Sequence, residues 1–117
     1  MFEEILTDEL KAKGTITMTT EYAWKYTDAV EVVNYLSQRE YVLLGGDVLN
    51  SDFSYTYDNW YYSYNHSISL EDNLKWSVLK AIEYVGWYNK KFGDGYYYII
   101  VAADKNEYLR LLAQAKR

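Results

Sequence analysis

Few residues in this sequence are of a type that could carry out chemistry. The chain has one histidine, His66, and no cysteine, so no second histidine or thiolate is present to complete a zinc site. A Ser-His-Asp triad is defined by geometry in space, but nothing resembling the Gly-x-Ser-x-Gly motif of a nucleophile elbow occurs. His66 lies in the polar segment 64–67, which is typical of a solvent-exposed loop. We therefore expect no enzymatic activity, no metal and no cofactor, and we favour a protein that acts by binding.

The most distinctive short motif is Gly45-Gly46-Asp47, which follows the apolar run 41–44. A glycine-rich phosphate-binding loop needs more backbone donors and a following helix, and neither is evident here. Adjacent glycines at the end of a strand instead indicate a positive φ, a β-bulge or the close approach of another backbone segment. We expect Asp47 to accept hydrogen bonds from neighbouring amides, so that its loss destabilises the fold.

Aromatic residues are unusually frequent, with 15 tyrosines and four tryptophans. Such side chains anchor cores but are also enriched at protein interfaces, so their placement decides their role. Strand alternation can send only about half of the segment 53–64 into the core. We assign Phe53, Tyr55 and Tyr57 to the buried face. The opposite face then presents Trp60, Tyr62 and Tyr64 as binding anchors, unless a bulge near Asp58 and Asn59 reverses the parity.

The charge and composition exclude several classes of partner. Seventeen acidic and twelve basic residues give a net charge of −5, which repels a phosphate backbone and disfavours nucleic acid. No segment approaches the roughly 18 consecutive apolar residues of a membrane span. The acidic start of the chain, with Glu3 and Glu4, lacks the positive charge of a secretory signal. We expect a cytoplasmic protein that binds neither nucleic acid nor membrane.

Apolar periodicity predicts four helices, over residues 2–13, 20–39, 70–92 and 105–116. The second could instead start near residue 28, where Asp28 and Glu31 resemble a capping pair. The third is the most regular, with Ser69 as a possible N-cap and Gly93 as terminator. Three residues lie off its apolar stripe and predict extensive burial of this helix: Trp76, Leu79 and Trp87.

Three strands are predicted, over residues 41–46, 53–62 and 95–103. The last is continuously apolar or aromatic, which is typical of a central strand covered on both faces. Asp104, with Glu107 three residues later, predicts the start of the final helix. No proline, repeat or linker divides the chain. We predict one domain, residues 1–117, of the α+β class: a small, mainly antiparallel three-stranded sheet packed with about four helices.

Two blocks of this sequence resemble the immunity protein 40 family of bacterial polymorphic-toxin systems. The blocks are 41–48 and 57–61, and Ser77, Ala81 and Tyr84 fit a later part of the pattern. The resemblance covers residues 20–102, although Leu49 stands where the family has an aromatic residue. It implies a cytoplasmic protein without enzymatic activity that binds and neutralises a cognate toxin. It marks these motif positions: Gly45, Gly46, Asp47, Asp58, Asn59, Trp60 and Tyr61.

The resemblance and the aromatic segment together define the predicted site. Gly45 and Gly46 are assigned a structural role. The predicted partner-binding residues are Asp47, Asp58, Asn59, Trp60, Tyr61, Tyr62 and Tyr64. A small acidic domain with aromatic anchors suits a toxin that has a basic active-site cleft, through charge steering. The alternative is a small carbohydrate-binding module, with Trp60 and Tyr62 as a stacking platform beside Asp58 and Asn59.

Overall fold

A five-stranded sheet packed with helices forms the structure, a computed structural model that describes residues 2–115. Its elements in chain order are the 3-10 helix η1 (Phe2–Ile5), α1 (Asp8–Lys13), β1 (Thr15–Ile16), β2 (Tyr22–Trp24), α2 (Tyr26–Gln38), β3 (Tyr41–Leu49), β4 (Tyr55–Tyr61), α3 (Leu70–Phe92), β5 (Tyr97–Asp104) and α4 (Lys105–Ala115). Every neighbouring pair in the strand order β1-β2-β5-β3-β4 is antiparallel. The predicted α+β class and four α-helices are confirmed within the described residues.

The prediction of three strands was wrong, because β1 and β2 extend the sheet beyond β5. These strands contain two and three residues, which is too short for a clear alternation of apolar and polar side chains. Residues 22–24 were assigned to a helix over 20–39, whereas α2 begins at Tyr26 after Lys25 as N-cap. The alternative start near Asp28 is also not observed.

The other helix boundaries follow their capping residues. Thr7 divides the predicted helix 2–13, because its hydroxyl oxygen accepts from the backbone N–H of Leu10 at 3.1 Å and starts α1 there. α3 spans Leu70–Phe92 as predicted, between Ser69 and Gly93. Asp104 caps α4 by accepting from the N–H of Glu107 at 2.8 Å. Residue 116 of the predicted last helix lies outside the described residues.

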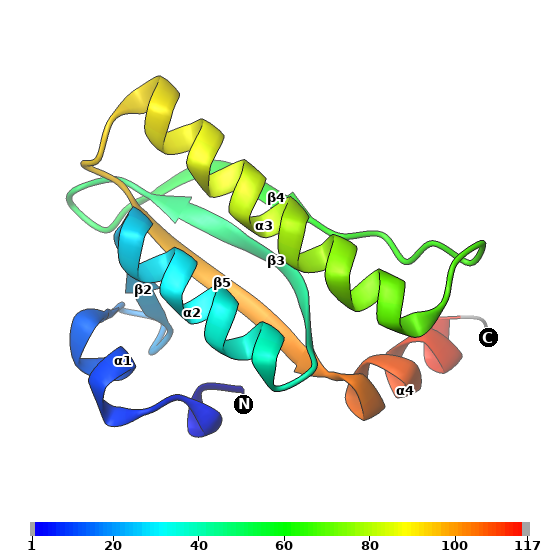
Figure 1. Cartoon of the computed structure of the whole chain (residues 1–117). Helices are drawn as coiled ribbons and strands as arrows, with labels where there is room; N and C mark the ends of the chain where they lie inside the picture. The colour runs from blue at the N-terminus through cyan, green and yellow to red at the C-terminus, as the bar shows by residue number, and fades with distance from the viewer. Residues whose placement is uncertain (1, 116–117) are drawn as a thin grey trace.

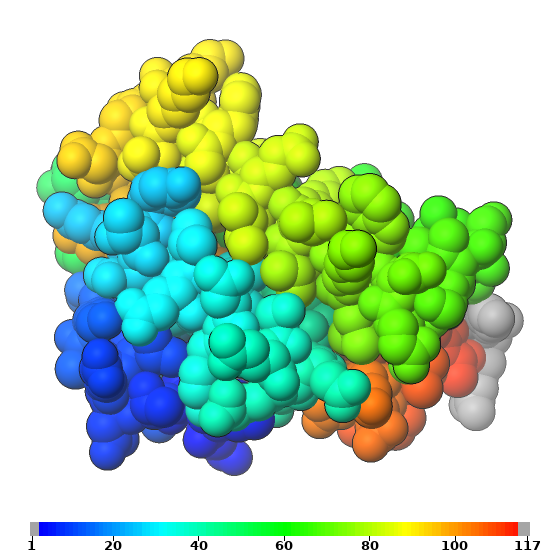
Figure 2. Space-filling model, in the orientation of Figure 1, coloured from blue at the N-terminus to red at the C-terminus, as the bar shows by residue number. Residues whose placement is uncertain are grey.

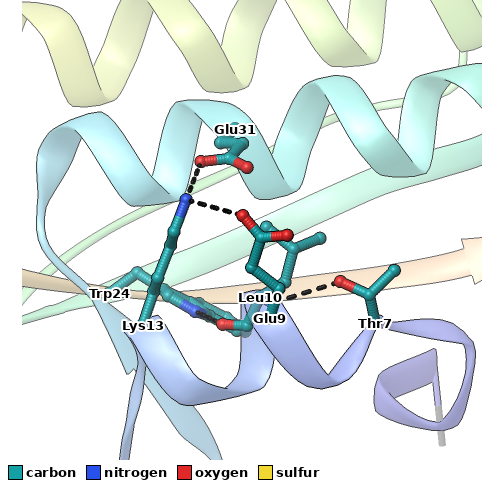
Figure 3. A network of polar contacts seen from close by, with 6 residues as sticks. All are labelled: Thr7, Glu9, Leu10, Lys13, Trp24 and Glu31. Carbon is teal, nitrogen blue, oxygen red and sulfur yellow. Dashed lines mark hydrogen bonds and ion pairs between the residues drawn. The ribbon is translucent and has the colours of Figure 1, made fainter.

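The N-terminal segment is attached to the sheet and to α2 by polar contacts (Figure 3). The indole N–H of the fully buried Trp24 donates to the backbone oxygen of Leu10 at 2.9 Å. Lys13 lies 2.8 Å from Glu31 of α2 and 3.6 Å from Glu9. The Trp24 bond joins α1 to β2, and the Lys13–Glu31 pair joins it to α2.

The two faces of the sheet are covered differently. α2 and α3 lie side by side across one face (Figure 1), where the main core contains Trp24, Leu43, Val48, Trp60, Tyr98 and Ile100. β5 is the central strand, as predicted, and is buried along most of its length. On the other face, α4 covers one end through Tyr108. A smaller cluster of Ala23, Leu49 and Ile99 packs with Phe53 and Tyr97. No helix of the described residues covers the centre of that face.

Candidate functional site

The two distinctive sequence blocks are direct partners in the sheet. In the antiparallel register of β3 and β4, Gly45 lies opposite Tyr61, Gly46 opposite Trp60 and Asp47 opposite Asn59. Cross-strand partners point to the same face of a sheet. The blocks therefore form one unit with an inner side, toward α3, and an outer side, on the face without a helix.

The inner side of this unit is built around Trp60, which is only 5% exposed. A Cβ atom on Gly46 would collide with the carbonyl oxygen of Ile99 and would lie 2.8 Å from Cζ3 of the Trp60 ring. A Cβ on Gly45 would collide with the carbonyl oxygen of Trp60, and Gly45 has φ +155°. The structural role predicted for the two glycines has this physical basis: their missing side chains make room for Trp60 and for the neighbouring strands.

Helix α3 closes the inner side with the residues of the third sequence block. The ring of Tyr84 stacks on Trp60 with centroids 5.0 Å apart. Ser77 is fully buried, and its hydroxyl oxygen accepts from the backbone N–H of Leu43 at 3.1 Å, at an irregularity in the pairing of β3 with β5. Ala81 is also fully buried. The three blocks of the pattern therefore meet in one packed layer.

The predicted exposure was wrong for three of the aromatic side chains, whereas Phe53, Tyr62 and Tyr64 are all half-buried. Trp60 is buried, whereas Tyr55 and Tyr57 are 39% and 89% exposed. A bulge does occur. Asp47 pairs with Asn59 and Leu49 with Tyr55, so a step of two residues along β3 corresponds to a step of four along β4. Tyr57, inside this bulge, has φ +69°. The bulge adds an even number of residues to β4, so it leaves the parity of the strand unchanged. The space above Gly46 is what directs Trp60 inward.

The outer side presents Asp47, Asn59 and Tyr61 around a hollow of about 300 Å³. The glycine hollow, as we name it, is lined by Leu44, Gly45, Gly46, Asp47, Asn59, Trp60, Tyr61 and Val101. Tyr61 is 67% exposed at its rim. On this side of β3 the glycine at position 45, which pairs with Tyr61, contributes no side chain to fill the hollow.

Asp47 lies in this hollow without a partner. Within residues 2–115, no hydrogen bond or ion pair joins its carboxylate to another residue, so the predicted bonds to neighbouring amides were wrong. Partial burial raises the pKa of Asp47 above its ordinary value, and the negative charge of Glu21 raises it further. The ionised carboxylate would therefore gain from a cation supplied by another molecule.

The remaining predicted site residues lie elsewhere and support the fold. Asp58 accepts from the hydroxyl of Tyr88 in α3 at 2.8 Å, and burial together with this bond raises the pKa of Tyr88 to about 12. Tyr62 donates to the side-chain oxygen of Asn73 at 2.5 Å. Tyr64 is half-buried against Tyr108 of α4. The structure therefore does not bring these side chains to the glycine hollow.

Two features of α3 were not anticipated. Asn73 is fully buried, and its amide group bonds with Tyr62, Ser69 and both backbone groups of Asn65, so it fixes the segment before the helix. Only its position on an otherwise apolar helix face could have indicated this. Trp76, Leu79 and Trp87 were expected to be buried but are 54%, 43% and 50% exposed.

The described residues offer no site of other common kinds. No three His, Cys, Asp or Glu side chains within residues 2–115 gather closely enough to hold a metal ion. No helix in the same part of the chain is both long and apolar enough to span a membrane. His66 is exposed in a turn before α3, as predicted.

Comparison with known proteins agrees with the pattern in the sheet. The family model described as Immunity protein 40 matches residues 9–102, a range that contains β2 through most of β5 and all three sequence blocks. No curated protein and no solved structure matches the chain. The match confirms the resemblance found in the sequence: the chain belongs to the immunity protein 40 family.

Proposed function

We propose that this protein is an immunity protein that binds a cognate bacterial toxin in the cytoplasm and neutralises it in a stoichiometric complex, by binding and not by catalysis. The observation that carries the proposal is the family match, which spans the paired blocks of β3 and β4. Packing in the core explains why Gly46 and Trp60 occupy the inner side of these blocks. It does not explain the residues on the outer side, which face solvent.

The outer half is the proposed toxin-binding surface, with Asp47, Asn59 and Tyr61 as its contact residues. Tyr61 supplies an exposed aromatic side chain of the kind that is enriched at binding hot spots. Asp47 supplies a carboxylate without a partner in its own described chain, next to the negative charge of Glu21. A basic side chain of the toxin, such as one from a basic active-site cleft, would complement this charge, and the net charge of −5 would speed the encounter.

The structure disfavours the carbohydrate-binding alternative. That hypothesis needs Trp60 as an exposed stacking platform, but its ring is buried beneath Tyr84. Its partner Tyr62 is engaged with Asn73. Asp58 is engaged with Tyr88.

The proposal is tested by calorimetric titration of the purified protein against the toxin encoded by the neighbouring gene. We expect a 1:1 ratio of the two chains and loss of toxicity in the complex. Tyr61→Ala should weaken binding by at least about 2 kcal/mol, roughly thirtyfold, while the melting temperature stays close to that of the wild type. Tyr57→Ala is the matched control, because it removes an 89% exposed tyrosine ring from the same strand, outside the lining of the glycine hollow.

Absence of binding to that toxin would contradict the function. Equal affinity of Tyr61→Ala and the wild type would instead contradict the surface while leaving the function in place. Asp47→Asn is a second test of the proposed binding surface, because it keeps the shape of the side chain and removes its charge.

A further inference from the structure

Helix α3 presents a stripe of exposed side chains on the side turned away from the sheet. At about 100° per residue, the stripe falls within one sector of the helix surface. It consists of Asp72, Trp76, Lys80, Glu83, Trp87 and Lys91, all of them exposed. The space-filling view shows α3 as the upper rim of the molecule, uncovered along this side (Figure 2). Two half-exposed tryptophans on one helix face are typical of an interaction surface.

The order of these residues is symmetric about the point midway between Ala81 and Ile82. Trp76 and Trp87 lie equally far from this point on either side, and so do Lys80 and Glu83. Asp72 and Lys91 form the outermost matching positions and again carry opposite charges. In a two-fold symmetric interface, residue i of one copy contacts residue j of the other, and j contacts i. A second, antiparallel copy of α3 therefore places each charged side chain of the stripe opposite a side chain of the other sign.

We propose that two copies of this chain associate through α3, with the helices antiparallel about a two-fold axis between Ala81 and Ile82. Lys80 of each copy pairs with Glu83 of the other, and Asp72 of each pairs with Lys91 of the other. Within residues 2–115, none of these four side chains forms an ion pair in its own chain. The nearest described partner of Lys80 is the ring of Tyr61, 5.6 Å from its Nζ to the ring centre. Lys91 lies over the ring of Trp87 in its own chain, 5.1 Å from its Nζ to the ring centre, and remains exposed.

A groove beside the first half of the stripe receives the tryptophan of the second copy. It has a volume of about 470 Å³ and is lined by Tyr62, Ser63, Asn65, Ile68, Trp76, Leu79, Lys80 and Glu83. Trp87 lies about 16 Å further along the helix than Trp76. The two-fold axis therefore brings Trp87 of one copy beside Trp76 of the other, over this groove. Leu79 supplies further apolar surface there.

The size of the stripe sets the expected strength of this dimer. With Trp side chains that bury roughly 150–250 Å² when fully covered, the stripe and Leu79 would bury on the order of 500 Å² on each copy. The total of roughly 1,000 Å² is at the lower end of specific interfaces, so we expect a weak, reversible dimer. Asp47 and Asn59 of the glycine hollow lie on the face of the sheet opposite α3 and stay accessible in the dimer, whereas the ring of Tyr61 at the rim lies near Lys80.

Sedimentation equilibrium of the full chain from about 1 to about 300 μM tests the proposal. The wild type should shift from monomer to dimer with concentration. Glu83→Lys and Lys80→Glu should each raise the dissociation constant at least about tenfold, because each places like charges opposite one another. The double variant Lys80→Glu with Glu83→Lys should restore it to within about threefold, since both symmetric pairs are then exchanged. Glu71→Lys is the control: the same charge change on the same helix, outside the stripe.

Trp87→Ala should weaken the dimer by a similar factor, and circular dichroism should show that each variant is folded. A wild type that stays monomeric up to about 300 μM overturns the proposal. So does a dimer that forms equally well with Glu83→Lys and Trp87→Ala, or a double variant that remains as weak as the single ones. The measurement does not involve the toxin, so its outcome is independent of the proposed function.

Discussion

Gly46 lies directly opposite Trp60 in the register of β3 and β4, and the Trp60 ring occupies the space that a side chain at position 46 would need. The carbonyl oxygen of Ile99, on the neighbouring strand β5, closes the same space from the other side. Tyr84 then covers the ring from α3. One missing side chain therefore determines how the edge strand β4 attaches to the sheet and which of its faces turns inward.

Gly46→Ala should destabilise the fold by about 3 kcal/mol or more, because neither the Ile99 backbone nor the enclosed Trp60 ring can move aside easily. Gly95→Ala is the control, since a Cβ there meets nothing within 4 Å. Urea denaturation of the two variants and the wild type measures the difference. Equal midpoints for the two variants would show that the Gly46 site can relax.

Ser77→Ala should destabilise the protein by about 1–3 kcal/mol, because the buried N–H of Leu43 then loses its acceptor where the pairing of β3 with β5 is irregular. Ser37→Ala provides the matched control on the exposed surface of α2. Urea midpoints give the change in stability, and hydrogen exchange at Leu43 reports the bond itself. Slow exchange at Leu43 in Ser77→Ala would contradict the assignment.

The sequence predicted those parts of the fold whose signals are local. α3 was placed from Leu70 to Phe92 because its apolar spacing is regular and both ends carry capping residues. β5 was recognised as central because it is apolar on both faces. β2 was missed because its three residues are too few to show an alternation and because it pairs with β5, which lies far away in the sequence.

The seven candidate binding residues named from the sequence include the three outward-facing side chains around the glycine hollow, Asp47, Asn59 and Tyr61, but the orientation of β4 was not predicted. Alternation along β4 separates two sets of side chains, and it does not say which set faces the core. That choice depends on Gly46 of another strand and on Tyr84 of a helix. The resemblance marked the two blocks but could not divide them into packing and outward-facing residues, because the two kinds alternate within a few positions of each other.

Asp47→Asn should make the protein slightly more stable at neutral pH. The pKa of Asp47 is raised in the folded state by partial burial and by Glu21, so the folded protein binds this proton more tightly than the unfolded chain does. Stability is therefore lost as the pH rises from the ordinary value of 3.8 through the raised pKa. Solvent screening limits the gain of the variant to less than about 1 kcal/mol.

Urea midpoints of the wild type and Asp47→Asn at a series of pH values check this. The two curves should converge as the pH falls below 3.8, where Asp47 is protonated in both states. A variant that is less stable than the wild type at neutral pH would show instead that the carboxylate accepts a structural hydrogen bond.

The bond from Tyr88 to Asp58 predicts a stability change in alkali. The pKa of Tyr88 is raised to about 12, first by burial and then by its hydrogen bond to Asp58, from an ordinary value of 10.0. A raised pKa means that the protonated phenol is favoured in the folded state. The associated stability is fully present below pH 10 and is lost as the pH rises from 10 toward 12.

Tyr88→Phe separates this effect from those of the other buried tyrosines, which the variant retains. At neutral pH the variant should be less stable than the wild type by about 1 kcal/mol, because the bond to Asp58 is lost. Above pH 10 this difference should shrink and then reverse, since phenylalanine has no proton to lose.

Asp58→Asn should lower the pKa of Tyr88 but leave it above 10.0, because burial is the larger cause. Urea midpoints and the alkaline ultraviolet titration of tyrosinate measure both effects. A difference between Tyr88→Phe and the wild type that stays constant across pH 10 to 12 would contradict the raised pKa.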